Sequence, residues 1–175
     1  MGRTTVLATV LTLVPVTAQA AEPPCLAPAE FSAVSSYALP SLIRGAISRC
    51  GPSLPSTAFL RTSGEALARK YDAGRIAAWP TAKAAFLKVG TIMNPQVSGL
   101  FGAMPDSALR PMVDGSMVNM VGQRLPIDRC TSLDRAIELV APLPAANAAK
   151  LVGIAAGLWA GDGRARLGQF SVCKT

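Results

Sequence analysis

Apolar residues recur every three or four positions along most of the chain, which is the spacing of one face of an α-helix. The first such segment runs from residue 28 to residue 50, and its stripe consists of Phe31, Val34, Ala38, Leu42, Ala46 and Cys50. We predict a helix over residues 28–50 with a kink or a break at Pro40, because proline lacks an amide donor and clashes with the preceding turn. Gly51 and Pro52 are expected to end this helix.

Five later segments carry the same periodicity and are separated by proline or glycine. They predict helices from Ser56 or Thr57 to Asp72, from Ile76 to Val89, from Asp106 to Val121, from Thr131 or Ser132 to Ala141, and from Ala145 to Ala160. Pro80 is expected at or near the start of its helix, and Asp106 is expected to act as an N-cap. Between residues 90 and 105 the pattern weakens, which predicts a loop with at most one helical turn.

Two further features of the pattern set the fold class. No stretch sustains the period-two alternation of a β-strand, which argues against a sheet. Residues 151–160 are apolar on all sides and too few to cross a membrane, which takes about 20 apolar residues, so they predict a buried central helix. The sequence therefore predicts an all-α, single-domain, irregular helical bundle of about five to seven helices.

The composition fits one folded domain and removes several kinds of chemistry. Half of the 175 residues are hydrophobic and only 15% are charged, the opposite of the balance in disordered chains. Histidine is absent, which takes away the commonest general base, the commonest metal ligand and the ordinary serine or cysteine triad. The sequence has no glycine-rich phosphate loop and no zinc-binding spacing. We therefore assign no catalytic residue, no metal ligand and no cofactor from the sequence.

The N-terminal segment has the features of a secretory signal peptide. They are Arg3, the apolar run from Val6 to Val16, and the small-x-small pattern Ala18-Gln19-Ala20. We predict that residues 1–20 form a cleaved signal peptide, that residues 21–175 form the single helical domain, and that the protein is periplasmic or secreted. An uncleaved N-terminal anchor is the alternative, whereas after cleavage we expect no stable membrane insertion.

Four cysteines lie in the expected mature part, namely Cys25, Cys50, Cys130 and Cys173. An even number of cysteines in an exported chain indicates two disulfides that staple the bundle. Metal binding is the alternative, but the sequence has no Cys-x-x-Cys pair and no histidine to complete a site. Of the three possible pairings we favour Cys25 with Cys173, tying the two ends, and Cys50 with Cys130, joining two loops that flank helices. The sequence leaves the other two pairings open.

The positive charge of the chain is scattered. The formal net charge is +7, and removal of Arg3 with the leader lowers it to +6. The closest approaches to a basic cluster are Arg61, Arg69, Lys70 and Arg75, and Arg164 with Arg166. Nucleic-acid-binding proteins usually carry a dense basic patch, so we expect no nucleic-acid partner. The charge is better suited to solubility and to weak attraction to anionic envelope surfaces.

Methionines form one compositional cluster, which consists of Met93, Met104, Met112, Met117 and Met120. Thioethers are soft ligands for Cu(I), so such a cluster in an exported protein raises a copper-binding hypothesis. Because the chain lacks histidine and a tight run of methionines, we favour core filling, which gives the same spacing on a helix face. Trp79 and Trp159 could line a small-ligand pocket, but core packing is favoured for both.

Carboxylates are the most plausible catalytic groups that remain. Asp134 and Glu138 lie one helical turn apart, but glycosidase chemistry needs two carboxylates across a cleft. We favour an ordinary solvated helix face for them and for the intervening Arg135. Ser171 and Lys174 match an S-x-x-K pattern without its partner motifs, which indicates a chance match. Residues 161–163, Gly-Asp-Gly, are expected to form a turn rather than part of a dinucleotide fingerprint.

These observations leave three functional hypotheses. We favour an exported helical protein with a non-enzymatic binding or structural role, whose partner is an unknown protein or an envelope component. The alternatives are a carboxylate-dependent envelope hydrolase and a small periplasmic inhibitor or immunity-type protein. Buried acidic side chains lining a cleft would favour the hydrolase, whereas uniformly exposed carboxylates would favour the binding protein.

Overall fold

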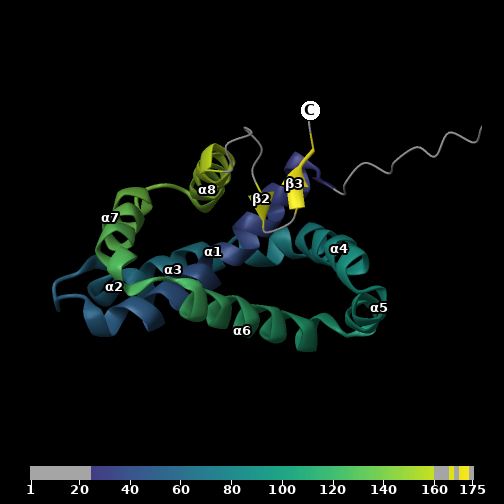
Figure 1. The fold of residues 1–175 in the computed structure, drawn as a ribbon, viewed down its shortest axis with the longest axis horizontal. Helices are drawn as coiled ribbons and strands as arrows, with labels where there is room; N and C mark the ends of the chain where they lie inside the picture. The colour runs from purple at the N-terminus through teal and green to yellow at the C-terminus, as the bar shows by residue number, and fades with distance from the viewer. Residues whose placement is uncertain (1–24, 160–165, 168–169, 174–175) are drawn as a thin grey trace, which may run out of the picture.

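The computed structural model describes residues 25–159, 166–167 and 170–173. In that part of the chain eight α-helices follow one another, and a small sheet joins the two ends (Figure 1). The helices are α1 (Pro28–Cys50), α2 (Phe59–Thr62), α3 (Gly64–Asp72), α4 (Arg75–Met93), α5 (Pro95–Ala103), α6 (Asp106–Arg124), α7 (Cys130–Val140) and α8 (Ala145–Trp159). Short 3-10 turns occupy Gly51–Ser53 and Ile127–Arg129. The all-α prediction is confirmed, with eight helices in the described residues where five to seven were expected.

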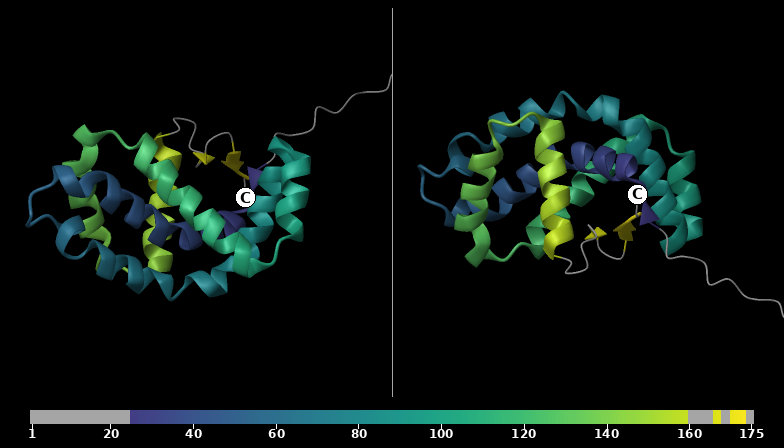
Figure 2. Two further views of the ribbon diagram at one scale, coloured as in Figure 1. Left: turned by 90° about the horizontal axis from the view of Figure 1, so that it is seen from below. Right: turned by 90° about the horizontal axis from the view of Figure 1, so that it is seen from above.

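The central helix of the molecule is α1, against which α3, α4, α6 and α8 all pack (Figures 1 and 2). The sequence predicts that residues 151–160 form a buried central helix. This prediction is wrong for residues 151 and 152, the two whose side chains the structure describes. Leu151 and Val152 of α8 are 45% and 42% exposed, while Ala148 and Ala149 are buried. The small side chains of α8 lie inward, so its apolar character does not place it at the centre. The side chains of residues 153–160 lie outside the described part.

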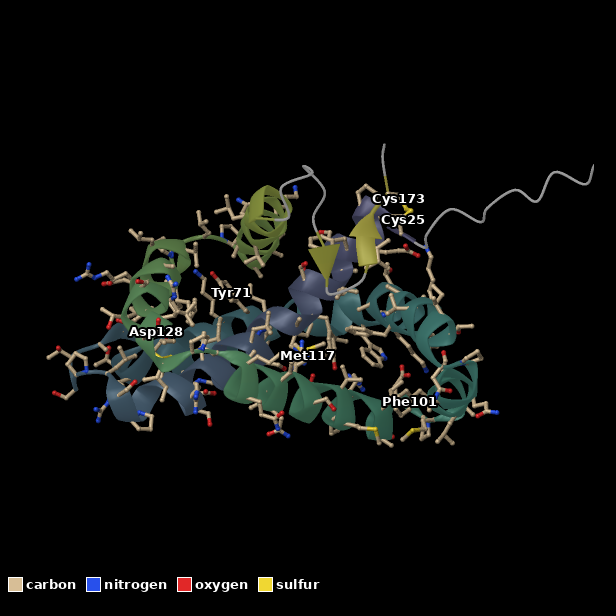
Figure 3. The ribbon with its side chains drawn as sticks, in the orientation of Figure 1. Cys25, Tyr71, Phe101, Met117, Asp128 and Cys173 are labelled. Atoms are coloured by element: carbon tan, nitrogen blue, oxygen red, sulfur yellow. A yellow bond between two sulfur atoms is a disulfide. The ribbon has the colours of Figure 1, made fainter. Side chains whose placement is uncertain are left out.

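Buried side chains gather in two clusters, one at each end of α1. The first joins Leu39, Ile43, Ala46 and Cys50 of α1 to Leu60, Leu67, Tyr71 and Cys130. The second joins Phe31, Val34 and Tyr37 of α1 to Trp79, Ala82, Ala85 and Leu109. Figure 3 shows Tyr71 at the first cluster, with Phe101 and Met117 at the second. Each end of α1 therefore organises its own set of neighbouring helices.

The bounds of α1 are those that the apolar stripe predicts, and Pro40 does not split the helix. Pro28 occupies its first turn, and the carboxylate of Glu30 accepts a hydrogen bond from the Ala27 amide at 2.7 Å. At the other end the Gly51 amide donates to the carbonyl of Ile47. Pro40 is buried inside a continuous helix, because the packing on both clusters holds the flanking turns in place.

Most of the region between residues 90 and 105 is helical, so the prediction of a loop there is wrong. α4 extends through Pro80 to Met93, and α5 follows immediately. The Asn94 side chain caps α5 by accepting a hydrogen bond from the Val97 amide at 3.2 Å, and Pro95 takes the first helical position. An N-cap followed by proline therefore starts a helix here in place of the predicted loop.

Two other helix starts also differ from the prediction. The segment expected to be one helix up to Asp72 is divided at Ser63 into α2 and α3. Pro105 is the residue before α6, and Asp106 is its first helical residue rather than its N-cap. The carboxylate of Asp106 instead accepts a hydrogen bond from Lys83 of α4 at 2.7 Å. A tertiary ion pair has replaced the local cap.

A small three-stranded sheet joins the ends of the chain. Its strands are β1 (Cys25–Leu26), β2 (Arg166–Leu167) and β3 (Phe170–Val172), in the order β1-β3-β2, with β1 parallel and β2 antiparallel to β3. The Cys173 amide extends the pairing by donating to the Leu26 carbonyl at 2.9 Å. The sequence pattern argued against a sheet, and strands of two or three residues are too short to show alternation.

Both favoured disulfide pairings are confirmed. Cys25 is bonded to Cys173 beside the small sheet (Figure 3). Cys50, at the end of α1, is bonded to Cys130, at the start of α7, and both residues are buried in the first cluster. The first disulfide closes the molecule at its surface, and the second is part of its core.

In the described helices, none combines the length and the apolar character that a membrane crossing requires. The signal peptide predicted for residues 1–20 lies outside the described residues and stays a prediction.

A close approach between α1 and α6 depends on Gly45. A Cβ atom at this position would lie 2.7 Å from Cβ of Val121 and 3.0 Å from the carbonyl oxygen of Val118. We expect Gly45→Ala to lower the free energy of unfolding by about 2 kcal/mol, because two packed helices must separate to admit the methyl group. Urea unfolding followed by circular dichroism measures this loss.

Gly51→Ala is the matched control for this change. A Cβ atom on Gly51 would meet nothing within 4 Å, and its φ of −50° suits any residue. We expect a change within about 0.5 kcal/mol. Equal stability of the two alanine variants would show that α1 and α6 move apart without cost.

Candidate functional site

The solvated face predicted on α7 is confirmed for Arg135 and Glu138 and is wrong for Asp134. Asp134 is buried, with 8% of its surface exposed, whereas Glu138 and Arg135 are exposed. The two carboxylate oxygens of Asp134 accept hydrogen bonds from the amides of Phe59, at 3.2 Å, and Leu60, at 2.7 Å. Asp134 therefore caps the start of α2 from a different helix, and each of its carboxylate oxygens accepts one structural hydrogen bond.

The methionines divide between core and surface. Met104 and Met117 pack against the second cluster, as predicted. Met112 and Met120 are 45% and 44% exposed, so core filling is wrong for these two. The side chain of Met93 lies outside the described part. Among the described residues, no group of three or more cysteine, aspartate or glutamate side chains is arranged to hold a metal ion.

The core prediction for Trp79 is confirmed. Its side chain is 4% exposed, and its ring centroid lies 4.8 Å from that of Tyr37. Three other predictions fall on residues whose side chains the structure does not describe, and they stay predictions. They concern Trp159, the pattern of Ser171 and Lys174, and the Gly-Asp-Gly turn at residues 161–163.

A charged pocket that the sequence did not reveal opens between the central helix α1 and the helices α3, α4 and α6, which lie around α1 in Figure 1. Its cavity volume is about 520 Å³. It is lined by Tyr37, Asp72, Arg75, Ile76, Ser107, Arg110, Pro111 and Asp114, and we call it the Arg75 pocket. This volume falls within the range of small-molecule sites, about 300 to 1,000 Å³.

The guanidinium of Arg75 is held in place from four sides. It forms ion pairs with Asp72 of α3, at 3.3 Å, and with Asp114 of α6. It also donates to the Ser41 hydroxyl at 3.3 Å, and its guanidinium carbon lies 4.4 Å from the centroid of the Tyr37 ring. The side chain of Arg75 is only 12% exposed. These contacts fix one wall of the pocket, since every partner comes from a packed helix.

Asp72 belongs to a wider ion-pair network. Arg44 of α1 contacts Asp72 at 2.5 Å and Glu65 at 3.4 Å. Burial raises the pKa of Asp72, but the hydrogen bonds and charges of Arg44 and Arg75 together outweigh burial and hold this pKa below its ordinary value. Asp72 is therefore ionised at neutral pH, and both of its oxygens are engaged.

Tyr37 lines the pocket as a neutral phenol. Its side chain is almost completely buried, with 1% of its surface exposed. Burial, and then the neighbouring Asp114 carboxylate, raises the pKa of Tyr37 well above its ordinary value. Its hydroxyl oxygen has no hydrogen-bond partner among the described residues. The phenol is unsuited to act as a nucleophile or base at neutral pH, because ionising it would place a second anion beside Asp114.

Two charged groups of α6 are left with unused hydrogen-bonding atoms. Arg110 donates through Nε to the Asp106 carbonyl at 3.3 Å, but within the described residues it forms no ion pair. The Oδ1 atom of Asp114 accepts from Arg75 and from Ser41, and none of the hydrogen bonds formed by the described residues ends on Oδ2, although the carboxylate lies close enough to the Tyr37 hydroxyl to raise its pKa. The terminal nitrogens of Arg110 and the Oδ2 atom of Asp114 therefore remain available at the pocket.

Sequence reasoning missed this site because its residues come from four helices. In the sequence Arg75 stands near other basic residues, whereas in the structure two carboxylates contact it. One signal was present in α6. Residues 110, 114, 118 and 121 share the face that packs toward Gly45, and that face carries Arg110 and Asp114 where apolar residues would be expected.

The chain matches no protein-family model, no curated protein and no solved structure. The function of the chain therefore has to be inferred from the chemistry of the Arg75 pocket itself.

Proposed function

We propose that this chain is an exported, non-enzymatic binding protein whose recognition site is the Arg75 pocket. The observation that carries the proposal is the combination of about 520 Å³ of open space with a polar wall that is already fixed by ion pairs. A site whose side chains are held in place before binding loses little conformational entropy when a ligand enters. The features of residues 1–20 and the two disulfides support export.

The carboxylates of the pocket fit binding better than hydrolysis. Asp72 and Asp114 line a cleft and are 35% and 30% exposed, a position that by itself would suit an envelope hydrolase. Glycoside hydrolysis needs one carboxylic acid that stays protonated near neutral pH. Asp72 is held ionised, and Asp114 is bonded directly to the Arg75 guanidinium. Neither group is placed to supply the proton, so the carboxylates serve as fixed acceptors.

Thermal unfolding in the presence of an envelope extract tests this proposal. The protein is recovered from the extracytoplasmic fraction, where an intact mass of residues 21–175 less four hydrogens supports export and both disulfides. We expect a protein-free envelope extract to raise the melting temperature of the native protein by several degrees. Arg110→Gln is expected to remove most of this shift. The extract should be chemically unchanged after incubation.

Arg124→Gln is the matched control, because Arg124 is an exposed residue in the last turn of the same helix. It should retain the full shift. Turnover of an extract component would favour the hydrolase instead. An equal shift in both variants would place binding outside the Arg75 pocket, and no shift in the native protein would contradict the binding function.

A further inference from the structure

The charges that line the Arg75 pocket balance each other. Two carboxylates, Asp72 and Asp114, face two guanidinium groups, Arg75 and Arg110. Because these formal charges cancel, the pocket as a whole offers no net attraction that would offset the desolvation of a ligand with a net charge of either sign. A ligand that is neutral as a whole but carries both charges can meet a guanidinium and a carboxylate at once.

The unused atoms at the pocket are a donor set and an acceptor, one helical turn apart. Arg110 offers its terminal nitrogens and Asp114 offers Oδ2, and neither group is spent on the other. Asp114 is turned toward Arg75 and Ser41 instead. Side chains four residues apart on a helix have Cβ atoms about 5–6 Å from each other. A small molecule whose two opposite charges are close together could lie between them.

From this arrangement we infer that the Arg75 pocket binds a small zwitterion, a molecule with one carboxylate and one ammonium group, as in a free amino acid. The inference rests on the proposed binding function and names its ligand class. The carboxylate accepts hydrogen bonds from Arg110, and the ammonium donates to Oδ2 of Asp114. Each contact joins opposite full charges, which makes it stronger than a neutral hydrogen bond.

The position of α6 sets the direction in which the ligand lies. Ser107 is in the first turn of this 19-residue helix, where the positive end of the helix dipole favours a carboxylate, and Arg110 follows in the second turn. Asp114 lies one turn further along, on the side where the ammonium is expected. The geometry therefore favours one orientation of the ligand over its reverse.

The rim of the pocket suits a ligand with an apolar substituent. Ile76 is 73% exposed and lines the pocket together with Pro111. A branched aliphatic group on the ligand would cover part of this exposed surface and would add to the binding free energy. Leucine is therefore a suitable probe, since it carries both charges and such a group.

Isothermal titration with three related probes tests the inference. L-Leucine carries both charges, L-leucinamide keeps only the ammonium, and N-acetyl-L-leucine keeps only the carboxylate. We expect L-leucine to bind the native protein at least about tenfold more tightly than either singly charged probe, because each lost contact is charge-assisted. Equal or tighter binding of a singly charged probe would overturn the assignment.

Two variants locate the binding. Arg110→Gln should weaken L-leucine binding about tenfold or more and leave L-leucinamide binding nearly unchanged, since only the carboxylate contact is lost. Arg124→Gln should bind all three probes as the native protein does. Undiminished L-leucine binding in Arg110→Gln would contradict the placement of the carboxylate.

The outcome also separates this inference from the proposed function. If none of the three probes binds while the envelope extract still shifts the melting temperature through Arg110, the zwitterion assignment is wrong and the binding function stands. If the extract shift is absent as well, both proposals are wrong.

Discussion

Replacing Cys50 and Cys130 together by alanine is expected to lower the free energy of unfolding by about 4 kcal/mol. This disulfide closes a sequence separation of 80 residues, and its removal frees the unfolded chain from that constraint. It also joins the last residue of α1 to the first residue of α7, inside the first buried cluster. Removing the bond therefore frees the unfolded chain and also loosens the buried contact between α1 and α7. For this reason we expect the largest loss of unfolding free energy for this variant.

The other disulfide, between Cys25 and Cys173, is expected to stabilise the fold less. Cys25 and Cys173 are 148 residues apart, so the length of the closed loop alone would assign their disulfide the larger effect. We expect the reverse, with a loss of about 2 kcal/mol for the double alanine variant. Strands of two and three residues can separate locally while the helices remain packed, so the native state also gains freedom when this bond is removed.

Guanidinium unfolding of the two double variants, followed by circular dichroism, measures both losses. Intact mass with thiol alkylation verifies that the remaining disulfide is formed in each variant. A larger loss for the Cys25 and Cys173 variant would contradict our expectation. It would show that closing the ends of the chain stabilises this fold more than joining α1 to α7.

The parts of the fold that follow from local patterns could be predicted from the sequence. The apolar stripe of α1 extends over six turns, and its bounds at residues 28 and 50 are those observed. The disulfide pairing also agrees, because the end of the first helix and the start of the seventh are brought together by the bundle. The helix bounds depend on periodicity and the expectation of two disulfides on cysteine count, whereas the choice among the three pairings is decided only by the fold.

Tertiary contacts decided the features that the sequence did not predict. Asn94 and Pro95 have the composition of a turn and of a helix start alike, and only the packing of α5 decides between them. Residues 151 and 152 are apolar but exposed, because α8 packs through its alanines. The Arg75 pocket combines α1, α3, α4 and α6, and no spacing within one segment indicates that Asp72 and Asp114 meet at one arginine.

Asp134, expected from the sequence on a solvated face, is buried and contacts α2. α2 has four residues, and its own N-cap residue, Ala58, has no side chain that can accept a hydrogen bond. Asp134 of α7 supplies that cap through its bonds to the Phe59 and Leu60 amides. A helix this short cannot persist without outside support. The carboxylate therefore holds α2 and α7 together.

Asp134→Ala is expected to lower the free energy of unfolding by about 3 kcal/mol, because two amides near the core lose a charged acceptor. Leu60 is only 1% exposed, so water cannot easily replace the carboxylate at its amide. Asp134→Asn should recover part of this loss, since its single carbonyl oxygen can still accept one hydrogen bond.

Glu138→Gln is the matched control, one turn further along the same helix and exposed. Its change should stay within about 0.5 kcal/mol. Urea unfolding of the three variants gives the comparison, and hydrogen exchange should be faster at both the Phe59 and Leu60 amides in Asp134→Ala, faster at one of them in Asp134→Asn, and unchanged in Glu138→Gln. If Asp134→Ala is as stable as Glu138→Gln, the buried carboxylate does not maintain the fold, and a chemical role for it would have to be considered again.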